Sequence, residues 1–451
     1  MPTVLFILYA VLARDAWMIL ITFPSFLAIV YFSSLERTRF VNENDIINFI
    51  CFLFFVVSPL QAIDGGKFFG SYISLIDTGY KEILIAQAVF LFFYLTFMRC
   101  LNSLKKRSRN SYYVWPDNIV IFFFLLTVVA FILHLASYGS IGNLLASRYN
   151  RDLEETSPIG FIWKSLQISA TLILFVSIYG SAPIKHLRPL AYVGVALLAI
   201  SINPFNIARN VLFSAWFPIL FIYIKGRVRP IHLHFLFAFA VIFVMPVVNY
   251  TGREGLSVSE SVDILRENFF DSLVAPISDV FDTLTVGVMW FSDNGFYYGQ
   301  KTLGLLLFFV PRAIWSGKAT LPGLDIGGYL YYLDFAGTAN LSFFLGGDFF
   351  ADFGLFGPVL GGCLTAAIVY ASIYRNNVIV NGYPLKALLF AGSLPILIRG
   401  PVAANVGLLF FEIIFITLFT VFLPVAQAHH SRPTLSGGST SSKIGHRNKA
   451  S

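Results

Sequence analysis

Long apolar runs alternate with short polar joints along most of this chain. Most runs come close to the roughly 20 residues that a helix needs to cross the hydrocarbon core of a bilayer. The pattern therefore predicts about twelve transmembrane helices. The predicted spans are Pro2–Ala13, Ala16–Phe32, Ile46–Ile63, Ile83–Met98, Asp117–Ala136, Ile159–Tyr179, Pro189–Ile202, Arg209–Ile224, His232–Tyr250, Gly354–Tyr374, Leu385–Ile398 and Val402–Pro424.

The composition excludes a large soluble protein. Hydrophobic residues make up 57% of the chain and charged residues only 12%, against about 25% charged in soluble domains. Too few polar side chains remain to cover a soluble core. We therefore predict an all-α polytopic integral membrane protein. The three cysteines show no zinc or redox spacing, and we expect no metal or cofactor.

Basic residues in short joints predict the orientation, because such joints stay in the cytoplasm. The joint 99–110 carries five Lys and Arg residues. Counting spans from it places the other basic joints and the C-terminal tail on the same side, which predicts that both termini are cytoplasmic. The net charge of +7 resides largely in these joints, so it does not indicate a nucleic-acid partner.

One long polar segment, Asn249–Asp352, interrupts the spans and falls on the outer face. It holds twelve of the 24 acidic residues. The chain thus divides into a nine-span bundle (1–250), a long outer loop (251–353), three C-terminal spans (354–424) and a cytoplasmic tail (425–451). The tail is rich in Ser, Gly, Lys and His, which predicts disorder.

The loop itself predicts several local elements. A Ser257-x-x-Glu260 capping box and apolar residues at helical spacing predict two amphipathic helices, over 258–269 and 277–288. The apolar piece Thr302–Val310 is too short to cross a bilayer and predicts a re-entrant helix. Glycine- and tyrosine-rich stretches at 296–299 and 327–332 predict turns.

Arginines on the outer face are the first candidate binding residues. Arg209, Arg312 and Arg399 each lie beside a Pro- or Gly-marked break in apolar sequence, and Arg253 lies in the loop. The planar guanidinium binds phosphate bidentately and never loses its charge. The alternative is that these arginines reach lipid headgroups or pair with loop carboxylates.

Carboxylates are the candidate catalytic groups. Asp348 and Asp352 are four residues apart, so on a helix they share a face as a base or metal pair. A cap for the following helix is an equal alternative for Asp352. No Asp-x-Asp motif is present, which argues against a transferase that holds a diphosphate through a metal. Glu412, inside the last span, suits a buried partner for an arginine better than a catalyst.

Four short motifs resemble the oligosaccharide repeat-unit polymerases, the Wzy-type O-antigen polymerases. They are Asn203-Pro204 with Arg209, Phe309-Val310-Pro311-Arg312-Ala313-Ile314-Trp315, Phe349-x-x-x-Phe353-Gly354-x-x-Gly357, and Arg399-Gly400. The predicted topology matches that family over nearly the whole chain. Ligases of similar architecture use an outer-loop histidine, and no histidine lies between His234 and His429.

The resemblance implies a metal-independent glycosyltransferase of the bacterial inner membrane. Such a polymerase moves a growing glycan from undecaprenyl diphosphate to a new lipid-linked repeat unit on the periplasmic face. It works beside membrane lipids with a flippase and a chain-length regulator. Arg209, Arg253, Arg312 and Arg399 are then expected to bind the diphosphate, and Asp348 or Asp352 to activate the acceptor hydroxyl. The alternatives are an O-antigen ligase-like transferase and a transporter or flippase of lipid-linked sugars.

Overall fold

The described part of the chain is mostly helical, as an all-α membrane protein requires. A computed structural model describes residues 50–59, 67–68, 73–74, 80–103, 111–114, 116–145, 158–179, 185–203, 209–224, 256–267, 269–310, 314–319, 322–332, 345–374, 378–380, 383–385, 402–422 and 426–427, with part of 22–30 and scattered single residues or pairs elsewhere. Within these ranges, four helical stretches are long and apolar enough, by length and composition, to cross a membrane: Glu82–Leu101, Asp117–Ala136, Gly160–Tyr179 and Gly346–Ala371, the last of which is divided by a 3-10 turn at Gly354. Shorter apolar helices are Arg188–Ser201, Val211–Ile222 and Val406–Phe419.

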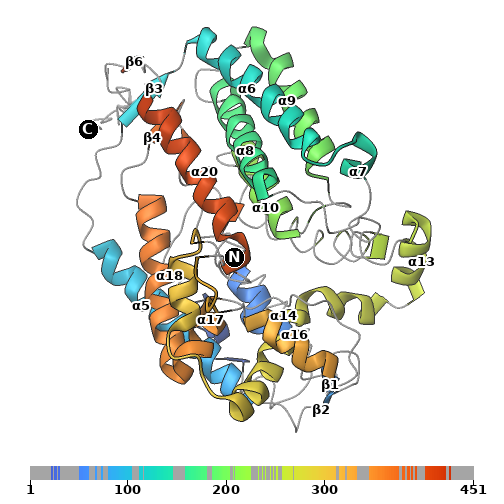
Figure 1. Cartoon of the computed structure of the whole chain (residues 1–451), viewed down its shortest axis with the longest axis vertical. Coiled ribbons are helices and arrows are strands. Elements are labelled where there is room, and N and C mark those ends of the chain that lie inside the picture. Colours follow the sequence, from blue (N-terminus) through green and yellow to red (C-terminus); the bar gives the residue numbers. More distant parts are fainter. Residues whose placement is uncertain are drawn as a thin grey trace, which may run out of the picture.

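A first group of helices packs around α8. Its members are α6 (Asp117–Ala136), α8 (Pro158–Tyr179), α9 (Arg188–Ser201), α10 (Arg209–Ile224) and α20 (Val402–Phe422). Figure 1 shows α6, α8 and α9 side by side, with α20 on the other side of α8. Gly194 permits the close approach of α9, since a Cβ there would lie 2.9 Å from Leu174 of α8.

Burial in this group follows the pattern expected of a protein surrounded by lipid. Helix α8 is buried on every side from Ser165 to Ile178, including its serines and threonines. By contrast, α6 exposes apolar side chains at helical spacing, among them Ile121, Leu125 and Val129. An apolar outer face over a partly polar interior is unsuited to water and suited to a bilayer.

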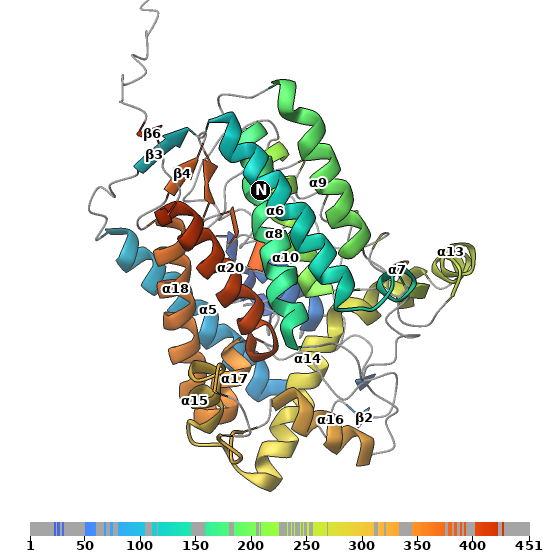
Figure 2. The same cartoon turned by 45° about the horizontal axis from the view of Figure 1, so that its top comes forward.

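A second group is built on α5 (Tyr80–Ser103) and α18 (Gly357–Tyr374). Figure 2 shows these helices crossing in the lower part of the molecule, beside α14 and α17. Gly362 is required at the crossing, because a Cβ there would lie 2.5 Å from the carbonyl oxygen of Phe90 on α5.

The helix before α18 folds back on it. Helix α17 covers Leu345–Phe353, and the 3-10 turn Gly354–Phe356 leads into α18. A Cβ on Gly361 would lie 3.1 Å from the Cα of Gly346, whereas one straight helix would separate these residues by about 22 Å. Gly354 adopts a left-handed φ of 58° at the reversal. The expected start of this span at Gly354 is therefore wrong by one turn, because residues 354–356 form the reversal.

Small strands, which the sequence did not predict, join several helix ends. A four-stranded sheet has the order β5-β4-β3-β6, from β3 (Ser111–Val114), β4 (Val378–Val380), β5 (Tyr383–Pro384) and β6 (Ala426–Gln427). Strand β3 pairs parallel with β4, in the register Ser111↔Val378, and antiparallel with β6. The segments after α5, α18 and α20 thus meet at one place (Figure 1). A separate hairpin pairs β1 (Lys67–Phe68) with β2 (Ile73–Ser74), and a π-helix covers Leu53–Val57.

The described part of the long loop contains α17 and four earlier helices: α13 (Val258–Glu267), α14 (Phe269–Asn294), α15 (Gln300–Leu306) and α16 (Pro322–Tyr332). The capping box is present, since Ser257 N–H donates to Glu260 (2.8 Å) and Glu260 N–H to Ser257 Oγ (3.2 Å). The turn expected at 327–332 is wrong, because these residues continue α16, which begins at Pro322 and buries Ile326. The short helix α7 (Ile141–Leu145) follows the end of α6 that is distant from β3 (Figure 1).

Several predicted elements lie outside the described residues. They are the span Pro2–Ala13, most of Ala16–Phe32, His232–Tyr250 and Leu385–Ile398, and the tail from His429 to Ser451.

Candidate functional site

The site begins at a tight turn between α14 and α15. Gly295, Tyr298 and Gly299 have positive φ angles of 79°, 51° and 90°, so the turn predicted at 296–299 is confirmed. The backbone N–H of Tyr297 donates to the Ala351 carbonyl at 3.0 Å, and that of Tyr298 to the Asp352 carbonyl at 3.1 Å. The turn is thereby fastened to the end of α17.

Asp352 fastens the helix that follows this turn. Gly299, the N-cap residue of α15, offers no side chain to the first backbone N–H groups. Asp352 replaces that cap: Oδ1 accepts from Lys301 N–H at 3.1 Å, and Oδ2 accepts from Thr302 N–H at 2.6 Å and from the Thr302 hydroxyl. The carboxylate is fully buried. A negative charge suits a helix N-terminus, so Asp352 does cap a helix, but α15 rather than the expected span from Gly354.

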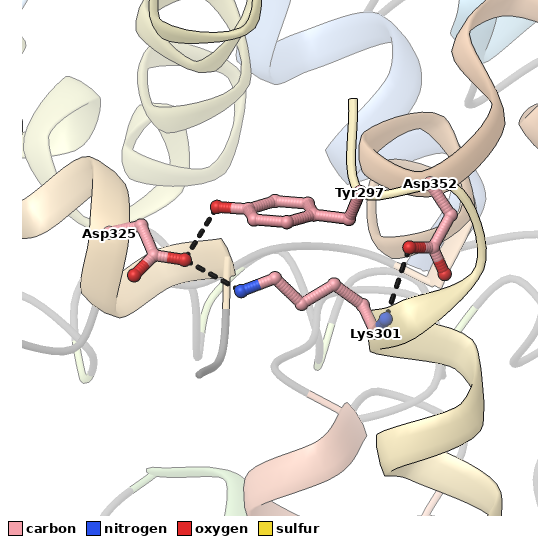
Figure 3. A network of polar contacts seen from close by, with 4 residues as sticks. All are labelled: Tyr297, Lys301, Asp325 and Asp352. Atoms are coloured by element: carbon pink, nitrogen blue, oxygen red, sulfur yellow. Dashed lines mark hydrogen bonds and ion pairs between the residues drawn. The ribbon is translucent and has the colours of Figure 1, made fainter. Parts of the chain in front are cut away.

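Lys301 connects α15 to α16 (Figure 3). Its Nζ donates to Asp325 Oδ2 at 2.6 Å, and the two side chains are only 4% and 23% exposed. The Tyr297 hydroxyl donates to the same oxygen at 2.5 Å. The ammonium also lies 3.8 Å from the centroid of the Tyr297 ring, which is favourable for a cation over an aromatic face.

The pKa values of this cluster are displaced in opposite directions. Burial lowers the pKa of Lys301, and this outweighs the opposing effect of Asp325, Asp352 and Asp348. Burial raises the pKa of Tyr297, and its hydrogen bond to Asp325 and the charges of Asp325 and Asp352 add to the increase. Tyr297 is therefore held as a hydrogen-bond donor at every physiological pH.

Asp348 lies one helical turn before Asp352 on α17, so the structure places both residues on one helix as predicted. Asp348 is more than nine-tenths buried, and its Oδ2 accepts no hydrogen bond from any described residue. Its charge acts on that of Lys301. Both oxygens of Asp352 accept hydrogen bonds from α15. Of the two carboxylates, Asp348 is therefore the one with an oxygen that can still accept a hydrogen bond.

A second lysine, Lys318, binds the backbone carbonyl groups just beyond the end of α15. Lys318 Nζ donates to the carbonyls of Leu307, Phe308 and Val310 at 2.9–3.1 Å, and these groups follow the last turn of the helix. The apolar piece 302–310 thus consists of the last five residues of α15, 302–306, and a lysine-bound turn. Phe308 packs edge-on against Phe410 of α20, with ring centroids 5.1 Å apart. The piece therefore rests on an apolar helix of the bundle.

The predicted arginines are mostly not part of the described residues. Arg209 begins α10, as its position after the Asn203-Pro204 break predicted, but its side chain is not described. Arg253, Arg312 and Arg399 lie outside the described residues. That these four arginines bind the diphosphate stays a prediction.

Sequence reasoning missed Lys301, Tyr297 and Asp325 as a unit. The available signals were a lysine two residues after a Tyr-Gly turn and an aspartate in the first turn of α16. Neither indicates its partner, because the loop offers twelve carboxylates. Among the described residues, no group of three or more His, Cys, Asp and Glu side chains is placed to hold a metal ion.

Comparison of the chain with models of protein families, with curated proteins and with solved structures found no match.

Proposed function

We propose that this chain polymerises lipid-linked oligosaccharide repeat units. It transfers the growing glycan from undecaprenyl diphosphate to a new lipid-linked repeat unit on the periplasmic face of the bacterial inner membrane. The observation that carries the proposal is Asp348, a buried carboxylate with an unpartnered oxygen at the junction of the outer loop and α18. A transferase without a metal needs such a group to take the proton of an acceptor hydroxyl.

The reaction assigned to this site is a displacement at the anomeric carbon. The acceptor hydroxyl gives its proton to Asp348, and its oxygen forms the new bond to the sugar. The bond from the sugar to the diphosphate oxygen breaks, and undecaprenyl diphosphate leaves with the electron pair. Fixed positive charges near the leaving oxygen favour this step because they stabilise charge that develops in the transition state.

Arg209, Arg253, Arg312 and Arg399 are proposed to supply these charges. Lys301 is less suited to bind the diphosphate directly, because Asp325 already holds its ammonium at 2.6 Å. The cluster of Tyr297, Lys301 and Asp325 instead holds α15 and α16 in place, and Asp352 fixes the start of α15. Asp352 is thus a positioning residue in this proposal, and Asp348 the base.

The finer topology belongs to the same proposal. Twelve spans with both termini in the cytoplasm place the joints after α5, α18 and α20 on one side. The joining of β3, β4 and β6 in one sheet supports that arrangement. Substrate arrives from a flippase, and a chain-length regulator acts on the growing product.

A surface-polysaccharide gel from a deletion strain tests the proposal. The wild-type gene should restore a ladder of long chains, whereas Asp348→Asn, Arg209→Ala and Arg312→Ala should leave a core with a single repeat unit at normal protein level in the membrane. Arg266→Ala is the matched control, because Arg266 is an exposed arginine on α13 of the same loop.

The other outcomes of this gel are equally informative. A core without any repeat unit in the deletion strain means a ligase or a flippase instead of a polymerase. A full ladder from Asp348→Asn removes Asp348 as the base.

A further inference from the structure

One arginine lies at an end of the helix bundle, apart from the loop cluster. Arg188 is the first residue of α9, and its guanidinium carbon lies over the face of the Tyr179 ring, 5.7 Å from the centroid. Tyr179 is the last residue of α8, and Phe175 of the same helix stacks on its ring with centroids 4.6 Å apart. The guanidinium therefore rests on an aromatic surface that is itself held in place, which is favourable for a cation.

The Arg188 side chain has hydrogen-bond donors to spare. The residue is partly buried, and its Nε is buried without a hydrogen bond to any described residue. A guanidinium stays charged in proteins and presents five N–H donors. A buried donor of a charged group is costly to leave unpaired, so an anion would be stabilised at this position.

The surrounding helices supply no carboxylate for this arginine. From Thr156 to Arg253 the sequence contains no acidic residue, so α8, α9 and α10 have none. In the group of helices around α8, Asp117 of α6 and Glu412 of α20 are the remaining acidic residues. Asp117 pairs with His186 at 2.9 Å, and Glu412 makes no hydrogen bond to a described residue. The counter-ion is therefore expected from outside this group of helices.

Arg188 lies where apolar spans end. His134, near the end of α6, bonds Gln167 in the first half of α8 at 3.0 Å, so these two candidate spans are antiparallel. The start of α6 and the end of α8 thus lie at the same end of the bundle, and the pair of Asp117 with His186 brings the start of α9 there too. Strand β3 ends three residues before α6 begins, so this end carries the four-stranded sheet. Lipid headgroups lie at such a boundary, and tyrosine is common there.

The face of α9 that begins at Arg188 continues as an apolar strip. Tyr192, one turn later, is 57% exposed, and its ring packs edge-on against Tyr179 with centroids 6.2 Å apart. Further along this face, Ala196 and Ala199 are exposed, small and apolar. A phosphate at Arg188 then has the Tyr192 side chain on the same helix face and an apolar path for an acyl chain along α9. These surfaces fit a phospholipid better than a free phosphate ion.

We propose that Arg188 and Tyr192 bind the phosphate of an anionic phospholipid at the end of the bundle that carries the four-stranded sheet. The guanidinium donates to the phosphate oxygens, the Tyr192 hydroxyl adds a further hydrogen bond, and an acyl chain lies along α9 past Ala196. In the topology proposed above, the lipid belongs to the cytoplasmic leaflet. The site is otherwise independent of the polymerase proposal, and its occupant stabilises the joined ends of α8 and α9.

Titration of the purified full chain in detergent with short-chain phosphatidylglycerol tests the site. Wild type should bind it more tightly than phosphatidylcholine of the same chain length. Arg188→Gln should bind phosphatidylglycerol about tenfold more weakly, because charged hydrogen bonds are lost. Arg266→Gln is the matched control, since Arg266 is exposed on α13, and should bind as wild type does. Equal affinity of wild type for the two lipids, or wild-type affinity in Arg188→Gln, would overturn the proposal.

Two further arms make the test decisive. Inorganic phosphate should not displace the lipid, and complete displacement would mean a site for free anions instead of a lipid site. Tyr192→Phe keeps the exposed ring and removes only the hydroxyl, so it should fold normally and bind phosphatidylglycerol about two- to tenfold more weakly. If Arg188→Gln does not fold, wild-type affinity in Tyr192→Phe contradicts the assignment.

Discussion

Asp352 caps a distant helix by accepting hydrogen bonds from both the backbone N–H and the hydroxyl of Thr302, which lies fifty residues earlier in the chain. Helix α15 has a glycine at its own N-cap position, so its first turn depends on this distant carboxylate. The contact joins the middle of the outer loop to the segment that reverses into α18. Any displacement of α17 is therefore transmitted to α15.

Replacement of Asp352 should cost stability. In Asp352→Ala the N–H groups of Lys301 and Thr302 lose a buried, charged acceptor, and we expect a loss of about 2–4 kcal/mol in the free energy of unfolding. Thermal unfolding of the purified protein measures this loss, and hydrogen exchange should locate it in residues 300–306. Asp293→Asn, at an exposed position on α14, should change neither the unfolding free energy nor the hydrogen exchange of residues 300–306. Unchanged exchange in α15 would contradict the capping role.

The ion pair of Lys301 with Asp325 should show strong energetic coupling. Lys301→Met or Asp325→Leu alone leaves a largely buried charge without its partner, at a cost of about 3–5 kcal/mol. The double variant leaves no unpaired charge and should be more stable than the sum of the two single losses predicts. A double-mutant cycle of unfolding free energies measures this coupling. If the losses in unfolding free energy of the two single variants simply add in the double variant, the two charges do not stabilise each other.

Tyr297 should make stability depend on alkaline pH. Its folded-state pKa lies above the ordinary value of 10.0, so above pH 10 the unfolded chain loses the phenolic proton while the folded chain keeps it. Unfolding then becomes easier as the pH rises. Below pH 10, Tyr297→Phe should be less stable than wild type by about 1–3 kcal/mol, because a hydrogen bond to Asp325 is lost. This difference should narrow above pH 10, and a constant difference in denaturant titrations at pH 9 and 11 would contradict the assignment.

The crossing of α5 and α18 should not tolerate a side chain at Gly362. The added Cβ of Gly362→Ala would meet the backbone of α5 at Phe90 and at Tyr94, 3.0 Å from the latter nitrogen. Since neither contact is with a flexible side chain, the helices must separate, and we expect a lower unfolding temperature and a lower protein level in the membrane. Gly328→Ala in α16 is the control, because no atom lies within 4 Å of its Cβ position.

The helices could be predicted wherever the local pattern carries the information. Bounds at Asp117–Ala136 and Arg209–Ile224 agree with the prediction residue for residue, because apolar runs of about 16–20 residues end at charged or proline-marked joints. The capping box before α13 could likewise be predicted, because its two residues lie three positions apart in the sequence. The reversal at Gly354 was not predictable in the same way, because the sequence predicts a loop up to Asp352 and one span from Gly354. Only the close approach of Gly346 to Gly361 shows that the end of the loop folds back on this span.

The site could be predicted only in part. Asp348 and Asp352 were found from their spacing, but the division of roles between them depends on Thr302 and on the missing cap of α15. The pair of Lys301 and Asp325 depends on how α15 and α16 pack, and no local pattern specifies it. Helix α16 was missed because its glycines and tyrosines predict a turn, whereas packing of Ile326 in the core stabilises a helix.

The most direct test of the central claim is a reconstituted reaction. Purified protein in lipid vesicles is supplied with undecaprenyl-diphosphate-linked repeat units in the presence of a metal chelator, and products are separated by length. Wild type should form lipid-linked products of two and more units and release undecaprenyl diphosphate. Asp348→Asn, with its folding verified by thermal unfolding, should be slower by about 100-fold or more. No elongated product from wild type, or an equal rate from folded Asp348→Asn, would contradict the account.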